Sequence, residues 1–137
     1  MELTFKTEVN ASKEMIWSYY TDPSKRSVWE EDLEILVFNG EIRTGTTGKM
    51  KLKDMPEMEF ELIKVIEGEA YWDRTILPHM GSLTFGHDIV QENGKLFIKH
   101  TVRLEKENVT ENDLGFLLGV FSDVPGSVMK IKQEVEK

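Results

Sequence analysis

Apolar and polar residues alternate most regularly over residues 81–106, and this pattern predicts two strands joined by a tight turn. The dipeptide Asn93-Gly94 lies between the two strands. It favours a two-residue type I′ turn, because both residue types tolerate the positive φ that such a turn requires. The turn therefore predicts which residues face each other across an antiparallel hairpin.

In this register Asp88 faces Lys99, so opposite charges meet on one side of the hairpin, as expected for a correct pairing. On the other side, His87 faces His100 within a row of apolar residues. That row consists of Leu83, Phe85, Ile89, Ile98, Val102 and Leu104. The sequence thus predicts two histidines that meet on the buried side of a sheet.

Shorter patterns of the same kind fill the first half of the chain. Ser12 is the predicted N-cap of a short helix that ends at Asp22-Pro23 and has an apolar side of Met15, Ile16, Tyr19 and Tyr20. Around this helix the patterns predict a strand at 2–9, a second short helix at 23–29, and strands at 33–38 and 45–52. The threonines and glycines of 45–52 indicate a twisted or edge strand.

A second hairpin is predicted over residues 58–77, with Glu67-Gly68 as a two-residue turn. Glu61 then faces Arg74, which again joins opposite charges. The same register places these side chains on one face: Met58, Phe60, Leu62, Tyr71, Asp73, Thr75 and Leu77.

The last segment, residues 110–137, carries apolar residues at helical spacing after a capping signal at Thr110 or Asn112. Pro125-Gly126 predicts a kink or a short break in this helix. The order is therefore one strand, two short helices, about six antiparallel strands and a long amphipathic helix. This order predicts a single α+β domain over residues 1–137, with the sheet curled around the final helix.

Composition narrows the range of partners. The net charge of −8, with no basic stripe, argues against binding to nucleic acid or to anionic lipid surfaces. The absence of cysteine excludes disulfides and cysteine-ligated zinc and fits a reducing compartment, so we expect a cytoplasmic protein. No leader sequence and no apolar run of about 20 residues is evident, so no membrane span is predicted.

Several short stretches resemble the START/birch-pollen-allergen superfamily (SRPBCC), and within it the polyketide cyclase/dehydrase-like group. They are Ala11-Ser12, Trp17, Thr21-Asp22-Pro23, Trp29, the stretch from Gly45 to Leu52, Met55-Pro56, Leu77-Pro78, the strand with Phe85 and His87, and the closing helix. The resemblance covers nearly the whole chain. It implies a helix-grip fold, in which a curved antiparallel sheet of about six to seven strands wraps a long C-terminal helix and encloses an apolar cavity.

The resemblance also implies binding of a small hydrophobic or amphipathic molecule, such as a lipid or a polyketide, in that cavity. Gly115 and Gly119 support a cavity, because they would remove bulk from the final helix. The predicted ligand-binding residues are Met50, Phe60, Tyr71, Asp73, Phe85, His87, Ile89, Ile98, His100, Val102, Leu118 and Phe121. A cyclase or dehydratase activity is the alternative function, and regulation of a partner protein without catalysis is another.

Catalytic signals are few. The chain has no phosphate loop, nucleophile elbow or His-Glu-x-x-His motif, and no cofactor is predicted. If residues 77–82 form a simple connection, Asp73 lies beside His87, and a row of Asp73, His87 and His100 crosses three strands. These three residues are the catalytic candidates.

The row admits three interpretations. The histidines can satisfy one another, Asp73 or trapped water in a purely structural role. They can orient a polar group of a ligand whose apolar part lies in the cavity. They can also do chemistry, either as a general base oriented by Asp73 or as ligands of a metal ion. No metal is predicted, because a third ligand is not assured.

Apolar residues also gather on the opposite face of the predicted sheet. They are Ile63, Trp72, Ile76, Val90 and Phe97. This set is large for a surface in contact with water, so a homodimer contact or an error in the predicted strand faces would explain it.

Overall fold

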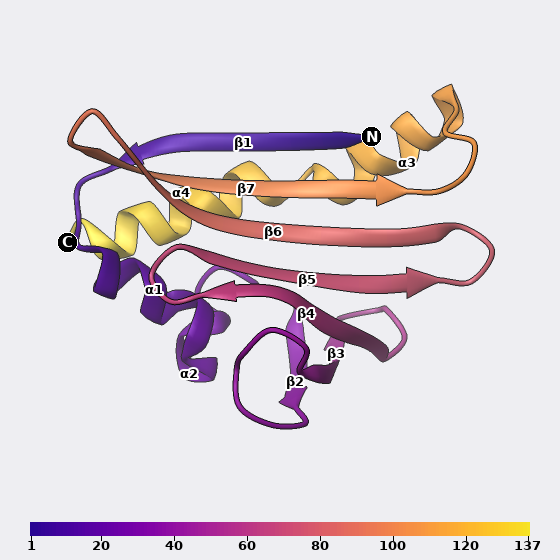
Figure 1. Cartoon of the computed structure of the whole chain (residues 1–137), viewed down its shortest axis with the longest axis horizontal. Helices are drawn as coiled ribbons and strands as arrows, with labels where there is room; N and C mark the ends of the chain where they lie inside the picture. Colours follow the sequence, from indigo (N-terminus) through magenta and orange to yellow (C-terminus); the bar gives the residue numbers. More distant parts are fainter.

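The structure is a computed structural model that describes the whole chain, residues 1–137. Its strands are β1 (Glu2–Val9), β2 (Leu33–Phe38), β3 (Thr47–Leu52), β4 (Met58–Ile66), β5 (Ala70–Leu77), β6 (Gly81–Glu92) and β7 (Lys95–Glu105). Its helices are α1 (Lys13–Thr21), α2 (Pro23–Arg26), α3 (Glu111–Phe121) and α4 (Val124–Val135). The seven strands form one antiparallel sheet in the order β1-β7-β6-β5-β4-β3-β2 (Figure 1).

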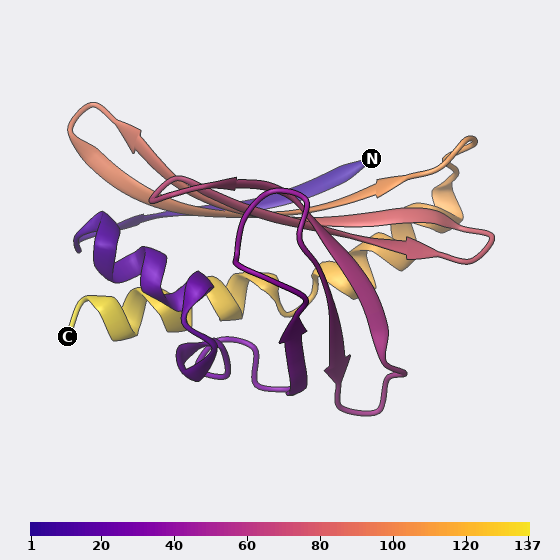
Figure 2. The ribbon, with the colours of Figure 1, turned by 60° about the horizontal axis from the view of Figure 1, so that its bottom comes forward.

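All four helices lie on the same side of this sheet (Figure 2). Figure 2 also shows that β2, β3 and β4 bend toward the helices, so that the sheet curls around α4. The predicted α+β class and the sheet wrapped on the C-terminal helix are therefore confirmed. The concave face of the sheet, which carries the helices, contains the apolar core.

The predicted register of the β6–β7 hairpin is confirmed. Glu92 pairs with Lys95, Asp88 pairs with Lys99, and His87 pairs with His100. Asn93 and Gly94 have φ values of 52° and 78°, as a type I′ turn requires.

The β4–β5 hairpin reaches its predicted pairing by a different route. Glu61 faces Arg74 as predicted, but the turn contains three residues, because Ile66 pairs with Ala70. A β-bulge between Leu62 and Lys64 offsets the extra residue and restores the register. The predicted two-residue turn is therefore wrong, although the predicted faces of both strands are correct.

Three smaller predictions also need correction. Met15 is 48% exposed and does not belong to the buried side of α1, which Ile16, Tyr19 and Tyr20 form. Helix α2 stops at Arg26, short of the predicted 23–29. Strand β3 is not an edge strand, because β2 lies outside it.

The C-terminal segment divides into α3 and α4 with a break at Ser122-Asp123, just before Pro125. Thr110 and Asp113 form the predicted capping box. By length and hydropathy alone, residues 111–135 would suffice to cross a membrane, although no membrane span was predicted. This is weak evidence for a span, because the core helix of a soluble protein passes the same test.

The predicted cavity between the sheet and the C-terminal helices is largely filled by side chains. Tyr20 and Trp29 pack there against Leu62, Ile98 and Ile131 in one apolar cluster of buried residues. Gly115 and Gly119 do not face this space: both are exposed, and a Cβ atom added at either would meet nothing within 4 Å. The prediction that these glycines remove bulk from a cavity is therefore wrong.

Two large apolar residues of the convex face, Trp72 and Phe97, are covered by basic side chains of the same chain. Lys6 lies over the Phe97 ring at 4.6 Å, and Arg103 lies over the Trp72 ring at 5.1 Å. The long stems of such cationic side chains shield apolar surface while their charges stay in water. Ile76 is the exception, with 68% of its surface exposed. A second copy of the chain is thus not needed to cover Trp72 and Phe97.

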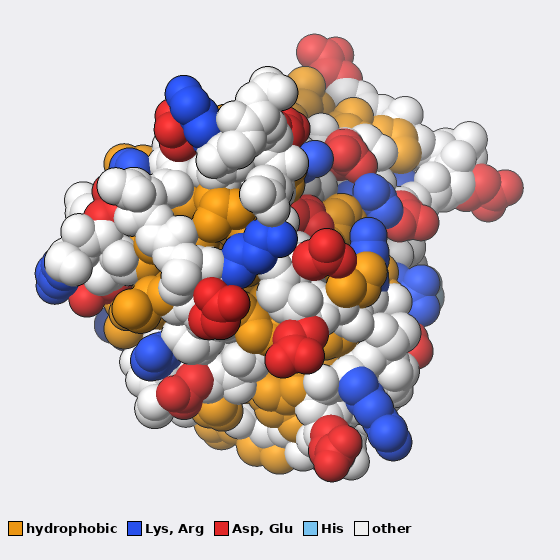
Figure 3. Space-filling model, turned by 60° about the vertical axis from the view of Figure 1, so that its left-hand side comes forward, with side chains coloured by type: hydrophobic (Ala, Val, Ile, Leu, Met, Phe, Trp, Pro, Cys, Tyr) orange, Lys and Arg blue, Asp and Glu red, His pale blue; other side chains and the backbone are white.

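Charged side chains of both signs are interspersed on the end of the molecule that carries the β6–β7 turn and the C-terminus (Figure 3). No continuous basic area is visible on this face, in line with the net charge of −8.

Candidate ligand-binding site

The histidine pair lies at the centre of the concave face, as predicted. The two rings meet edge to face with centroids 4.7 Å apart. Tyr71, and not Asp73, is the neighbour of His87 on β5. Asp73 faces Phe85 instead, because the β5–β6 connection contains only residues 78–80 and brings Leu77 opposite Gly81. The predicted row of Asp73, His87 and His100 is therefore wrong by two residues.

Both histidines have partners within the core. His87 Nδ1 lies 2.7 Å from the carbonyl oxygen of Tyr71, to which it donates a hydrogen bond. His100 Nε2 lies 2.9 Å from the hydroxyl group of Tyr20. Burial, together with the charge of Arg26, lowers the pKa of His87 to about 3. Burial, together with His87, lowers the pKa of His100 well below 6.5, so both rings are neutral near pH 7.

A buried cation beside this pair was not predicted from the sequence. Arg26 is 3% exposed, and its guanidinium lies over the rings of Trp29 and Tyr71, at 4.7 and 5.1 Å. It forms an ion pair of 2.8 Å with Glu30 and donates a hydrogen bond of 3.2 Å to the Tyr71 hydroxyl. The spacing of Arg26 and Glu30, four residues apart beside Trp29, was the available sequence signal.

Asp73 is the second buried charged group on this face, with 5% of its surface exposed. Its Oδ1 atom is buried and has no hydrogen-bond partner. The carboxyl lines a narrow gap with Arg26, Leu36, Met50, Phe60 and Tyr71, which is too small for a water molecule. Burial raises the pKa of Asp73 to about 7, although the charge of Arg26 acts in the opposite direction.

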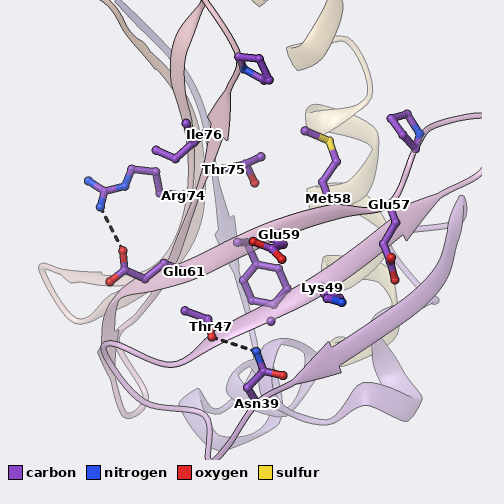
Figure 4. A pocket seen from close by; sticks show the side chains of 14 residues that line it. Asn39, Thr47, Lys49, Glu57, Met58, Glu59, Glu61, Arg74, Thr75 and Ile76 are labelled. Carbon is purple, nitrogen blue, oxygen red and sulfur yellow. Dashed lines mark hydrogen bonds and ion pairs between the residues drawn. The ribbon is translucent and has the colours of Figure 1, made fainter.

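A larger cleft opens where β4 and β5 separate. The two strands pair as far as Glu61 and Arg74, whereas β4 continues back to Met58 and β5 continues to Leu77. The cleft between them has a volume of about 600 Å³. In Figure 4, Thr75 and Ile76 lie on one side of it and Met58 on the other.

The rim of the cleft is mostly charged and polar. Glu57, Glu59 and Glu61 face Lys49 and Arg74 around it, and Arg74 is paired with Glu61 at 3.1 Å. Its inner wall is formed by Phe60 and Thr75, each only 5% exposed. Phe60 also lines the gap beside Asp73, so its ring borders both the cleft and the gap.

Eleven of the twelve predicted ligand-binding residues fall into three groups. Met50, Phe60, Tyr71 and Asp73 surround the gap. His87, His100, Ile89 and Ile98 are fully packed in the core. Val102, Phe85 and Phe121 belong to a smaller apolar cluster around Leu117, whereas Leu118 is 51% exposed and lies outside both clusters.

Comparisons with known proteins give a result only at the level of structure. No family model matches the sequence, and no curated protein matches it either. Among solved structures, Ara h 8.0201 superposes with a TM-score of 0.71 at 10% identity, over 98% of this chain and 97% of that chain. The two chains therefore share one fold, a curved antiparallel sheet wrapped around the C-terminal helix.

Two further structures extend this likeness. Norcoclaurine synthase from Thalictrum flavum, in complex with a transition state analogue, has a TM-score of 0.65 at 17% identity, over 100% of this chain and 96% of that chain. The Aha1 dimer from Colwellia psychrerythraea has a TM-score of 0.66 at 13% identity, over 96% of each chain. At these identities the likeness shows the helix-grip fold, and activity must be argued from the site.

Proposed function

We propose that this protein binds a small amphipathic molecule in the cleft between β4 and β5. The observation that carries the proposal is the separation of these two strands, which leaves a cleft of about 600 Å³ in an otherwise well-packed domain. Ligand pockets of small molecules have volumes of roughly 300–1,000 Å³. The charged rim and the apolar wall at Phe60 suit a molecule with one polar and one apolar part.

This proposal moves the ligand from the centre of the helix-grip to its side. His87 and His100 are enclosed by Tyr20, Trp29 and Tyr71, with ring centroids within 6 Å. A ligand at the histidine pair would therefore require the aromatic core to open, whereas the cleft is already accessible.

The lack of cysteine supports a cytoplasmic location for this protein.

A cyclase-type activity is the second candidate function, and one observation favours it. Asp73 has a pKa near neutrality, which suits a general base. Incubation with linear polyketide mimics, followed by mass spectrometry of the products, tests this activity. Product that forms equally well with Asp73→Asn would contradict a role for Asp73 as the base.

Native mass spectrometry of freshly purified protein tests the binding proposal. We expect a bound small molecule on the wild type and none on Met58→Trp, because the indole would fill the cleft beside Phe60. Met129→Trp is the matched control: Met129 lies on α4, is 37% exposed and does not line the cleft, so this variant should keep the bound molecule.

The binding proposal would be contradicted if two results held together. These are that the purified wild type carries no bound molecule, and that decylamine, decanol and decanoate all leave its amide NMR spectrum unchanged.

A further inference from the structure

We infer that Asp73 is the anchor for a hydrogen-bond donor on the ligand, and that the site selects amphiphiles with an ammonium group over those with a carboxylate. This inference rests on the proposed function and adds the chemical class of the ligand.

The carboxyl of Asp73 has a buried oxygen without a hydrogen-bond partner. Buried polar atoms in folded proteins almost always have a hydrogen-bond partner, so each exception calls for an explanation. Asp73 Oδ1 is such an exception on the concave face. The other one in this protein, Thr84 Oγ1, is on β6 next to Phe85 and therefore points to the opposite face.

No side chain around Asp73 donates a hydrogen bond to this oxygen in the structure. Arg26 donates to Glu30, to the Tyr71 hydroxyl and to the Tyr20 carbonyl oxygen. The remaining neighbours around the gap, Leu36, Met50 and Phe60, have no N–H or O–H group in their side chains. The Tyr71 hydroxyl, which also lines the gap and accepts from Arg26, makes no hydrogen bond to Asp73, so this oxygen is open to a donor on a ligand.

Charge indicates which donor fits best. Arg26 and Glu30 neutralise each other, so an ionised Asp73 leaves one uncompensated negative charge in the interior. A single cation would balance it, whereas a second carboxylate would add to it. The three glutamates on the rim of the cleft, against Lys49 and the paired Arg74, favour the same choice.

The access route passes Phe60. This ring packs edge to face against Phe38 at 5.7 Å and directly over Gly48, where an added Cβ atom would lie 2.5 Å from the ring. Phe60 lies on the part of β4 that has no partner on the β5 side, so its movement breaks no β4–β5 hydrogen bond. Rotation of this ring would join the cleft to the gap beside Asp73.

Isothermal titration calorimetry with decylamine and decanoate, below the concentrations at which they form micelles, tests the inference. Both probes have the same chain and differ in the charge of the head group. We expect decylamine to bind the wild type and decanoate to bind at least about tenfold more weakly, as expected when one charge-assisted hydrogen bond is lost. Asp73→Asn should weaken decylamine binding by roughly the same factor. Glu107→Gln, which removes one negative charge away from the cleft, should leave binding unchanged.

A second measurement avoids dependence on the folding of Asp73→Asn. In the wild type, the ¹³C shift of the Asp73 carboxyl reports its pKa directly. Bound decylamine should lower that pKa, because the ammonium favours the ionised carboxyl, as Arg26 does, and opposes the effects of burial and Glu30.

The outcomes separate the two proposals. The inference would be overturned if Asp73→Asn bound decylamine as tightly as the wild type, or if bound decylamine left the Asp73 pKa unchanged. If decanoate or decanol still bound in that case, and Met58→Trp blocked this binding, the cleft would remain a binding site. No binding of any decyl probe would overturn both.

Discussion

The histidine pair is held in a neutral state by its surroundings. Both imidazoles are buried, both have a hydrogen-bond partner, and the Arg26 charge further opposes their protonation. Their internal bonds to Tyr20 and Tyr71 favour the structural interpretation over the catalytic one. Asp73, by contrast, has a free acceptor oxygen.

The hydrogen bond between Tyr20 and His100 joins helix α1 to strand β7. Tyr20→Phe should lower the free energy of unfolding by roughly 1–3 kcal/mol, because it leaves a buried ring nitrogen without its partner. His100→Phe should also destabilise, and the double variant should lose less than the sum of the two. Urea unfolding of all four proteins measures the coupling.

Tyr19→Phe is the matched control for this cycle. Tyr19 is buried on the same helix, but its hydroxyl makes no hydrogen bond within the protein, so its removal should change stability little. Strict additivity of Tyr20→Phe and His100→Phe would show that the 2.9 Å contact does not contribute to stability.

Among the elements, β4 has the largest role in forming the site. A bulge at residue 63 bends it, and its first residues leave β5 while they stay paired with β3. The cleft is a direct consequence of this change of partner. Helix α3 has no comparable role, since its glycines face away from the sheet.

Gly115 and Gly119 on α3 have room for an added methyl group. Gly115→Ala and Gly119→Ala should each raise the free energy of unfolding by roughly 0.5–1 kcal/mol, because alanine restricts the unfolded chain and meets open space in the helix. Thermal and urea unfolding measure this change. Destabilisation would instead indicate that these positions face the interior.

Gly86→Ala on β6 provides the opposite case. A Cβ atom there would lie 2.4 Å from the Trp72 ring, which rests on this glycine. We expect a loss of roughly 1–3 kcal/mol from overpacking.

For the whole molecule, buried titratable groups determine how stability depends on pH. The unfolded chain protonates His87 and His100 near pH 6.5, whereas folding lowers the pKa of His87 to about 3 and that of His100 in the same direction. Stability is therefore lost as the pH falls below about 6.5. Asp73 acts in the opposite direction: its pKa is about 7 in the folded chain and 3.8 in the unfolded one, so its share of stability is lost as the pH rises between these values.

On unfolding between about pH 4 and 6.5, His87 takes up one proton and Asp73 releases one, so these two contributions nearly cancel. Burial lowers the pKa of His100 in the same direction as that of His87, so its proton uptake makes stability fall as the pH falls. Asp73→Asn removes the opposing contribution, so its stability should fall more steeply, by about 1.4 kcal/mol more for each pH unit over this range. Urea unfolding of the wild type and of Asp73→Asn at about pH 4.5, 5.5 and 6.5 measures how steeply the free energy of unfolding of each protein changes with pH. The histidines and Asp73 both contribute over about this range. Equal slopes would show that Asp73 has an ordinary pKa.

Local signals in the sequence determined the central hairpin and the fold class. Asn93-Gly94 determines a turn of known length, and a turn of known length sets every pairing along two strands, including that of His87 with His100. The order of strands and helices, with the capping box at Thr110, determined the layered arrangement. These features depend on residues that are close together in the chain.

The composition of the site was decided by the tertiary structure. The position of Asp73 depends on how residues 78–80 connect two strands, and the bulge at residue 63 compensates for a turn that the sequence mispredicts. The interior is filled by Tyr20 and Trp29 from distant segments, and Arg26 becomes a buried cation only when Glu30 and Tyr71 surround it. Volumes and charges inside a core depend on side chains from several elements at once, so no local pattern predicts them.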